Sequence, residues 1–175
     1  FPPPPPSRPD EASDEWEFPK RKWIEGWNKG TPGFDGTYDF FEEWIDRDVT
    51  DMVRRDRNHP SIFMWSIGNE VFERKKLEVV TTARKLADRC RSLDPTRPVT
   101  SALASWDSDW EIYDPLAAVH DIVGYNYLID KSEAHHQRVH DRVMWQTESY
   151  PRDVFANWVK VNDNPYIIGD FVWTG

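Results

Sequence analysis

The feature that most constrains this chain is a repeated alternation between short apolar runs and segments whose apolar residues recur at helical spacing. Apolar runs of about four to eight residues are typical of buried strands, whereas recurrence every third or fourth residue is typical of an amphipathic helix. The predicted strands cover residues 61–68, 98–103, 121–127, 142–148 and 166–173. Strands separated by helices predict βα units that pair into a parallel sheet.

The predicted helices lie in front of and between these strands. The first begins at Asp39, which with Glu42 resembles an N-cap and its capping-box partner. It ends at His59-Pro60, because a residue before proline avoids the helical region. A second helix carries its apolar face over 79–93 and ends before a proline, and further helices are predicted over 132–140 and 154–161.

Polar side chains follow the carboxyl ends of most of the predicted strands. Glu70 follows the first, Asn126 and Tyr127 close the third, Glu148 closes the fourth and Trp173 the fifth. Both a TIM barrel and an open doubly wound sheet place functional groups at this edge. No glycine-rich phosphate loop follows any of these strands, so the sequence favours the barrel.

The composition excludes several classes of partner. The chain has 22 Lys and Arg against 31 Asp and Glu, a net charge of −9, so no excess of cations exists to neutralise nucleic-acid phosphates or an anionic membrane surface. Its apolar runs are far too short to span a bilayer. One cysteine, Cys90, excludes an internal disulfide and a multi-cysteine metal cluster. The sequence indicates neither a compartment nor an oligomeric state.

Aromatic and histidine residues leave two alternatives open. The ten tryptophans contrast with a hydrophobic fraction of 38%, and core packing is the default interpretation for them. The alternative is that some stack on a flat, hydroxylated ligand beside carboxylates. His135, His136 and His140 have a spacing that can bind a metal on one helical face, but no carboxylate or cysteine pattern supports a site. We interpret them as exposed histidines on a polar helix, and expect no metal and no cofactor.

Several motifs together resemble one known family. They are RRDRNHPSIFMWSIGNE at 54–70, DPTRPVT at 94–100, DIVGYNY at 121–127, TES at 147–149 and DFVWTG at 170–175. This combination resembles the barrel domain of glycoside hydrolase family 2, which contains β-galactosidases, β-glucuronidases and β-mannosidases. The resemblance implies an α/β fold of the (β/α)8 TIM-barrel type, here an incomplete barrel covering roughly strands four to eight within residues 11–175. We interpret residues 1–10, which are rich in proline, as a disordered or non-native end.

The resemblance also implies roles for individual residues. Glu70 takes the place of the family's general acid/base and Glu148 that of its nucleophile, with Asn69 placed to bond a sugar hydroxyl. Tyr127 would donate a hydrogen bond to the nucleophile, the alternative being a packed tyrosine at the end of a strand. Trp173 would form a platform under the sugar ring, and Asn126 is a candidate for substrate contact.

The activity implied by these roles is hydrolysis of a carbohydrate with a terminal β-linked sugar, with retention of configuration through a covalent glycosyl-enzyme. We expect a β-galactosidase, with a β-glucuronidase or β-mannosidase as alternatives. Some family members bind magnesium through a carboxylate and a histidine; Glu15 matches the carboxylate, but Glu17 stands where the histidine is expected. The second hypothesis is a non-catalytic fragment with at most weak sugar binding, since the first three barrel strands are not recognisable and the isolated chain is expected to be inactive.

Overall fold

The computed structural model describes residues 41–71, 76–104 and 110–173. Residues 46–175 form one compact unit; of the other unit, residues 1–45, only the first residues of a helix are described. The helices are α2 (Phe41–Asp56), α3 (Leu77–Leu93), α4 (Asp114–Ala117), α5 (Ser132–Arg138) and α6 (Val154–Asp163), and the strands are β1 (Trp65–Asn69), β2 (Val99–Leu103), β3 (Val123–Asn126), β4 (Met144–Ser149) and β5 (Ile167–Val172). The predicted capping box at Asp39 and the proline-rich end lie outside the described residues.

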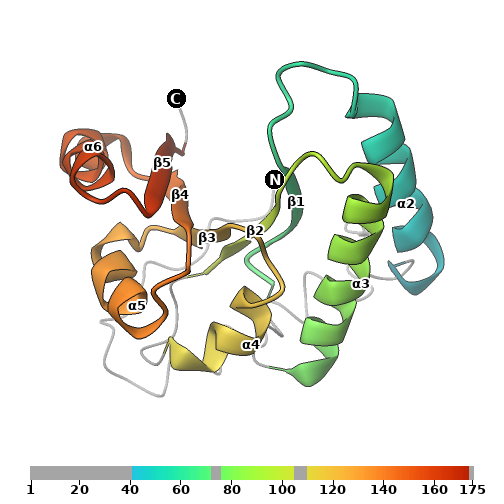
Figure 1. Cartoon of the computed structure of the whole chain (residues 1–175), viewed down its shortest axis with the longest axis horizontal. Helices are drawn as coiled ribbons and strands as arrows, with labels where there is room; N and C mark the ends of the chain where they lie inside the picture. Colours follow the sequence, from blue (N-terminus) through green and yellow to red (C-terminus); the bar gives the residue numbers. More distant parts are fainter. Residues whose placement is uncertain (1–40, 72–75, 105–109, 174–175) are drawn as a thin grey trace, which may run out of the picture. The chain divides into compact units, whose positions relative to one another are not determined.

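The described strands form one parallel sheet in the order β1-β2-β3-β4-β5, so each strand pairs with the next one along the chain. A doubly wound sheet reverses its strand order at a switch point, and this sheet has no reversal within the described residues. The helices α3, α4, α5 and α6 follow one another around one side of the strands, each close to the strands that it connects (Figure 1). This arrangement confirms the prediction of an incomplete (β/α) barrel.

The degree of burial differs between the strands. Every residue of β2 and β3 is buried, as predicted for central parallel strands. The apolar run 61–68 predicted a buried first strand, and this prediction was wrong: Trp65 is buried, but Ser66 and Asn69 are exposed, and Phe63 before the strand is 54% exposed. The physical reason is that β1 lies at an edge of the described sheet and pairs with β2 on one side.

Apolar residues at helical spacing form the layer between the helices and the sheet. Ala83, Leu86, Ala87 and Cys90 of α3 are all buried. A short helical segment that periodicity did not predict, η3 (Glu111–Tyr113) with α4, precedes β3. Trp110 in front of it packs edge-on against Tyr113 and Tyr125, with ring centroids 5.1 and 5.0 Å apart. The segment is too short to show helical periodicity, which explains why pattern analysis missed it.

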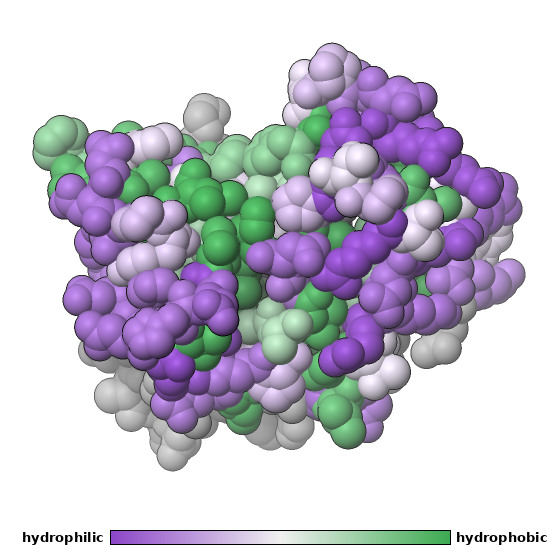
Figure 2. Space-filling model, viewed as in Figure 1, coloured by the Kyte–Doolittle hydropathy of each residue, from purple (hydrophilic) through white to green (hydrophobic). Residues whose placement is uncertain are grey.

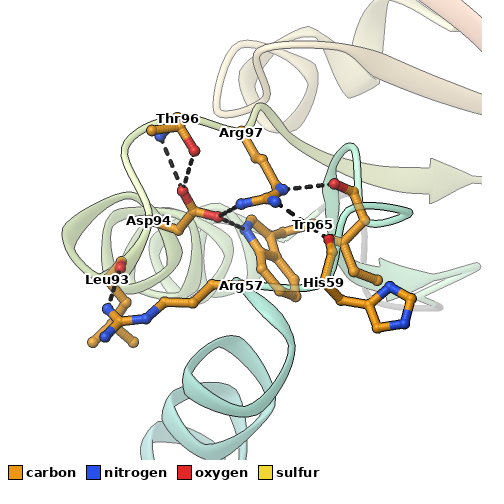
Figure 3. A network of polar contacts seen from close by, with 8 residues as sticks. Arg57, His59, Trp65, Leu93, Asp94, Thr96 and Arg97 are labelled. Carbon is orange, nitrogen blue, oxygen red and sulfur yellow. Dashed lines mark hydrogen bonds and ion pairs between the residues drawn. The ribbon is translucent and has the colours of Figure 1, made fainter.

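A buried carboxylate connects the end of α3 to the start of the sheet (Figure 3). Asp94, 4% exposed, accepts hydrogen bonds from the indole of Trp65 at 3.1 Å and from the guanidinium of Arg97 at 2.6 Å. Thr96 donates two more, from its backbone N–H at 3.1 Å and from its hydroxyl at 2.5 Å. Arg97 also donates to the carbonyl oxygen of His59. His59 therefore lies at the amino end of β1, away from the strand's carboxyl end.

One prediction about the histidines was wrong. His135 on α5 is buried, with its Nδ1 3.1 Å from the hydroxyl of Tyr125 and its ring 5.4 Å from that of Trp110. His136 is half-buried and stacks on Tyr166 at 3.7 Å, whereas His140 is exposed as expected. The reason is that α5 lies against the sheet, so the side of the helix that carries His135 becomes part of the core.

Apolar and hydrophilic side chains are distributed differently over the strands and the helices. Apolar side chains gather along the middle of the view, where the strands lie, and hydrophilic side chains cover α3 and α5 (Figure 2). In the part of the chain that the structure describes, no helix is both long and apolar enough to cross a membrane.

Candidate active site

The predicted site residues lie where strands end. Glu70 follows the last residue of β1, and Tyr127 follows Asn126 at the end of β3. Glu148 is the next-to-last residue of β4. The register pairs Asn126 directly with Glu148. Because the strands are parallel, these residues share one edge of the sheet, the edge at which barrel proteins carry their functional groups.

Asn126 joins the ends of three strands. Its side-chain amide donates to Oε1 of Glu70 at 3.0 Å and to Oδ1 of Asn69 at 3.2 Å, and its own oxygen accepts from the hydroxyl of Thr147. Asn126 has no exposed surface, whereas Asn69 is exposed. Direct contact between Asn126 and a substrate stays a prediction; in this structure its amide holds the carboxylate of Glu70.

Tyr127 makes the equivalent connection to the other glutamate. Its phenol donates to Oε2 of Glu148 at 2.8 Å, and its backbone N–H donates to the carbonyl oxygen of Glu148 at 2.8 Å. Burial and the hydrogen bond to the Glu148 carboxylate both raise the pKa of Tyr127. The phenol therefore remains protonated and continues to donate. Two successive residues thus contact the two glutamates: Asn126 contacts Glu70, and Tyr127 contacts Glu148.

Backbone strain is located at this same edge. Among the described residues other than glycine, only Glu70 and Tyr127 have a positive φ, at 48° and 58°. A residue with a side chain in this region costs on the order of 1–3 kcal/mol, and such residues concentrate at functional sites. Each strained residue donates its N–H across the sheet, Glu70 to Ala102 at 2.9 Å and Tyr127 to Glu148. These bonds hold the strained conformations in place.

Trp173 lies just past the end of β5. Its backbone N–H donates to the carbonyl oxygen of Ser149 at 2.8 Å, and its side chain is 58% exposed. The indole is therefore accessible beside the end of β4. Its contact with a sugar ring stays a prediction.

Sequence reasoning missed a buried aspartate under the site. Asp170 of β5 accepts hydrogen bonds from Gln146 at 3.0 Å, Ser149 at 3.1 Å and Asn157 at 3.2 Å. It thereby connects β5 to α6 and to two residues of β4, one before and one after Glu148. One signal was available: an acidic residue inside the apolar run 166–173 is unusual for a buried strand and implies dedicated partners.

The metal-ligating side chains of the described residues do not converge. Within residues 41–71, 76–104 and 110–173, no three histidine, cysteine, aspartate or glutamate side chains are grouped so that they could hold a metal ion. Glu15 and Glu17, which the sequence analysis compared with a magnesium site, lie outside the described residues.

A parallel sheet wound in sequential order, with polar and acidic residues connected along its carboxyl edge, defines this chain as part of a (β/α)8 barrel. The comparisons give the family. The chain belongs to glycosyl hydrolases family 2, since residues 38–173 match the TIM barrel domain of that family.

Individual proteins that are similar to this chain are consistent with this family assignment. A β-galactosidase of Bacteroides ovatus, BoGH2A, is 32% identical, with 67% of this chain and 16% of the relative covered. A β-glucuronidase of Paenibacillus borealis is 30% identical, with 70% of this chain and 19% of the relative covered. The crystal structure of a family 2 member from Bacteroides cellulosilyticus is 38% identical with a TM-score of 0.77, covering 85% of this chain and 19% of that protein. The chain thus spans a small part of the length of these relatives.

Proposed function

We propose that this chain is the catalytic-barrel portion of a retaining β-glycoside hydrolase. The observation that carries the proposal is the Asn126-Tyr127 pair, whose side chains contact Glu70 and Glu148 respectively. Retaining hydrolysis requires two carboxyl groups about 5–5.5 Å apart, on opposite sides of one glycosidic bond. A connection through adjacent residues at the end of β3 supports such a pair, because it brings glutamates 78 positions apart in sequence to one edge.

In the proposed mechanism the two glutamates have different roles. The carboxylate of Glu148 attacks the anomeric carbon and forms a glycosyl ester, while Glu70 gives its proton to the departing glycosidic oxygen. Glu70 then takes a proton from water, the water oxygen attacks the anomeric carbon, and Glu148 leaves as a carboxylate. The contacts suit these roles: the phenol of Tyr127 donates a hydrogen bond to the carboxylate of Glu148, and the neutral amide of Asn126 positions Glu70.

The substrate that we propose is a β-galactoside. The relative from Bacteroides ovatus is named a β-galactosidase, whereas other relatives are named β-glucuronidases, so the choice within the family needs a direct measurement. Nitrophenyl β-galactoside, β-glucuronide and β-mannoside should be compared on the intact protein. Hydrolysis of the β-galactoside at the highest kcat/KM is the expected result. Cleavage restricted to an α-linked substrate would refute the proposal.

Substitution of the glutamates tests their roles. Glu148→Ala should abolish turnover of every substrate. Glu70→Ala should spare glycosylation by substrates with good leaving groups, and azide should then restore deglycosylation. Glu78→Ala, at an exposed position on α3, is the matched control and should leave kcat/KM unchanged. A fluorinated glycoside followed by peptide mass mapping should label Glu148; a label on Glu70 would reverse the assignment.

The second hypothesis, a non-catalytic sugar-binding fragment, applies to the 175-residue chain by itself. In the described sheet, β1 and β5 are the outer strands, and each pairs on one side. Outer strands that pair on one side within the described residues support the carboxylates less than a closed barrel does, and small misplacements reduce rates strongly. We expect little turnover by this chain, and rapid turnover would contradict that expectation.

A further inference from the structure

Tyr150 packs against Tyr127 beside the glutamate of β4. It lies two positions after Glu148, immediately past the end of β4, and its ring stacks on that of Tyr127 with centroids 4.5 Å apart and planes at 28°. The guanidinium of Arg152 lies 4.8 Å from the centroid of the Tyr150 ring. Neither residue was singled out by the sequence motifs.

Tyr127 needs such support because its backbone is strained at φ 58°. Residues 148–150 supply three contacts to it: the carbonyl oxygen of Glu148 accepts its N–H, a carboxylate oxygen of Glu148 accepts its phenol, and the ring of Tyr150 covers its ring. The hydrogen bonds fix the two ends of the residue. The ring contact fixes the part between them, which decides where the phenol oxygen lies.

We propose that Tyr150 is a positioning residue that acts through Tyr127, holding the phenol of Tyr127 on the carboxylate of Glu148. This inference rests on the proposed function insofar as Glu148 is the nucleophile. Stacked aromatic rings restrict each other's tilt, and a cation over the face of a ring favours the same placement. Without the Tyr150 ring, Tyr127 can tilt away from Glu148 or relax to ordinary backbone angles.

The kinetic test uses the intact protein with nitrophenyl β-galactoside. Tyr150→Ala should lower kcat about 10-fold with KM changed less than about 3-fold, because the lost contact acts on the reacting carboxylate rather than on ground-state binding. Tyr150→Phe retains the ring and should retain kcat. In a Tyr127→Phe background, Tyr150→Ala should cost less than about 2-fold, because the group through which it acts is already gone.

Phe155→Ala is the matched control. Phe155 is an aromatic residue of the helix that follows, and it is 83% exposed. Its removal should leave kcat unchanged. Equal losses of kcat for Tyr150→Ala in both backgrounds, or no loss in either, would overturn the inference.

A second measurement does not depend on activity. The ¹³Cζ resonance of Tyr127 reports the ionisation of its phenol, and burial and Glu148 raise the pKa of that phenol in the native protein. In Tyr150→Ala the phenol should titrate at lower pH than in Tyr150→Phe, which keeps the ring but, like alanine, removes the Tyr150 charge that also raises this pKa; equal titration in the two variants would refute the inference. Tyr150→Leu, which keeps apolar bulk, replaces the alanine variant if that variant does not fold. Absence of glycoside hydrolysis by the wild type would refute the proposed function, while this titration would still decide whether Tyr150 holds Tyr127.

Discussion

Replacement of Asp94 by alanine should destabilise the fold more than removal of any exposed carboxylate. Asp94 accepts four hydrogen bonds at 2.5–3.1 Å from Trp65, Thr96 and Arg97 and is 4% exposed. Alanine would leave the buried indole N–H of Trp65 without this acceptor and would remove the charged partner of Arg97, whose side chain is 19% exposed. The contact between the end of α3 and the start of β1 would be lost with it.

The magnitude follows from the pKa of Asp94. Burial by itself raises this pKa, but the hydrogen bonds from Thr96, Arg97 and Trp65 outweigh burial and lower it from 3.8 to about 2. That lowering corresponds to about 2–3 kcal/mol of stability from the ionised form. A carboxyl group whose folded pKa is depressed stabilises the protein above its unfolded pKa. This contribution is therefore complete above about pH 5 and is lost as the pH falls through 4 towards 2.

Urea denaturation followed by circular dichroism provides the assay. At pH 7, Asp94→Ala should lower the free energy of unfolding by about 2–4 kcal/mol, and the difference from wild type should shrink towards pH 2. Asp88→Ala is the matched control, since Asp88 is 66% exposed in its 3.4 Å pair with Arg91 and should cost less than about 0.5 kcal/mol. A loss for Asp94→Ala no larger than that of the control, or a difference that persists at pH 2, would refute the reasoning.

Three further predictions concern the core. Gly124→Ala should lower the free energy of unfolding by more than about 2 kcal/mol, because an added Cβ would lie 2.5 Å from the carbonyl oxygen of Ser101. Gly169→Ala should be nearly neutral, because its Cβ would meet nothing closer than 4.0 Å. Thermal unfolding of both variants provides the comparison. Burial raises the pKa of Cys90 to about 11 and leaves no surface exposed, so a thiol reagent should label the native chain far more slowly than the urea-unfolded chain; equal rates would contradict this. Burial and nearby arginines lower the pKa of His135 to about 4, so between pH 4 and 6.5 the unfolded state binds more protons than the folded state. The free energy of unfolding should therefore fall by up to about 3 kcal/mol as the pH drops through that window. His135→Gln should flatten the pH dependence of the urea midpoint.

Local patterns in the sequence were enough to predict most of the helices and strands, and its motifs were enough to identify the family. Helical spacing over 79–93 and apolar runs over 98–103 and 166–173 correspond to α3, β2 and β5 within a few residues, because local periodicity reports which side of an element is buried. The motifs around Glu70 and Glu148 identified the family that residues 38–173 match. These features depend on residues close together in the chain, so a linear pattern contains them.

Other features of the protein depend on contacts between residues that are far apart in the sequence. Which strand lies at an edge determined that Phe63 and Ser66 are exposed, and the packing of α5 against the sheet determined that His135 is buried. The strained backbone of Tyr127 and its stacking on Tyr150 arise from pairing between β3 and β4. No local pattern encodes such contacts, because the register of two strands and the hydrogen bonds across it exist only after the chain has brought them together.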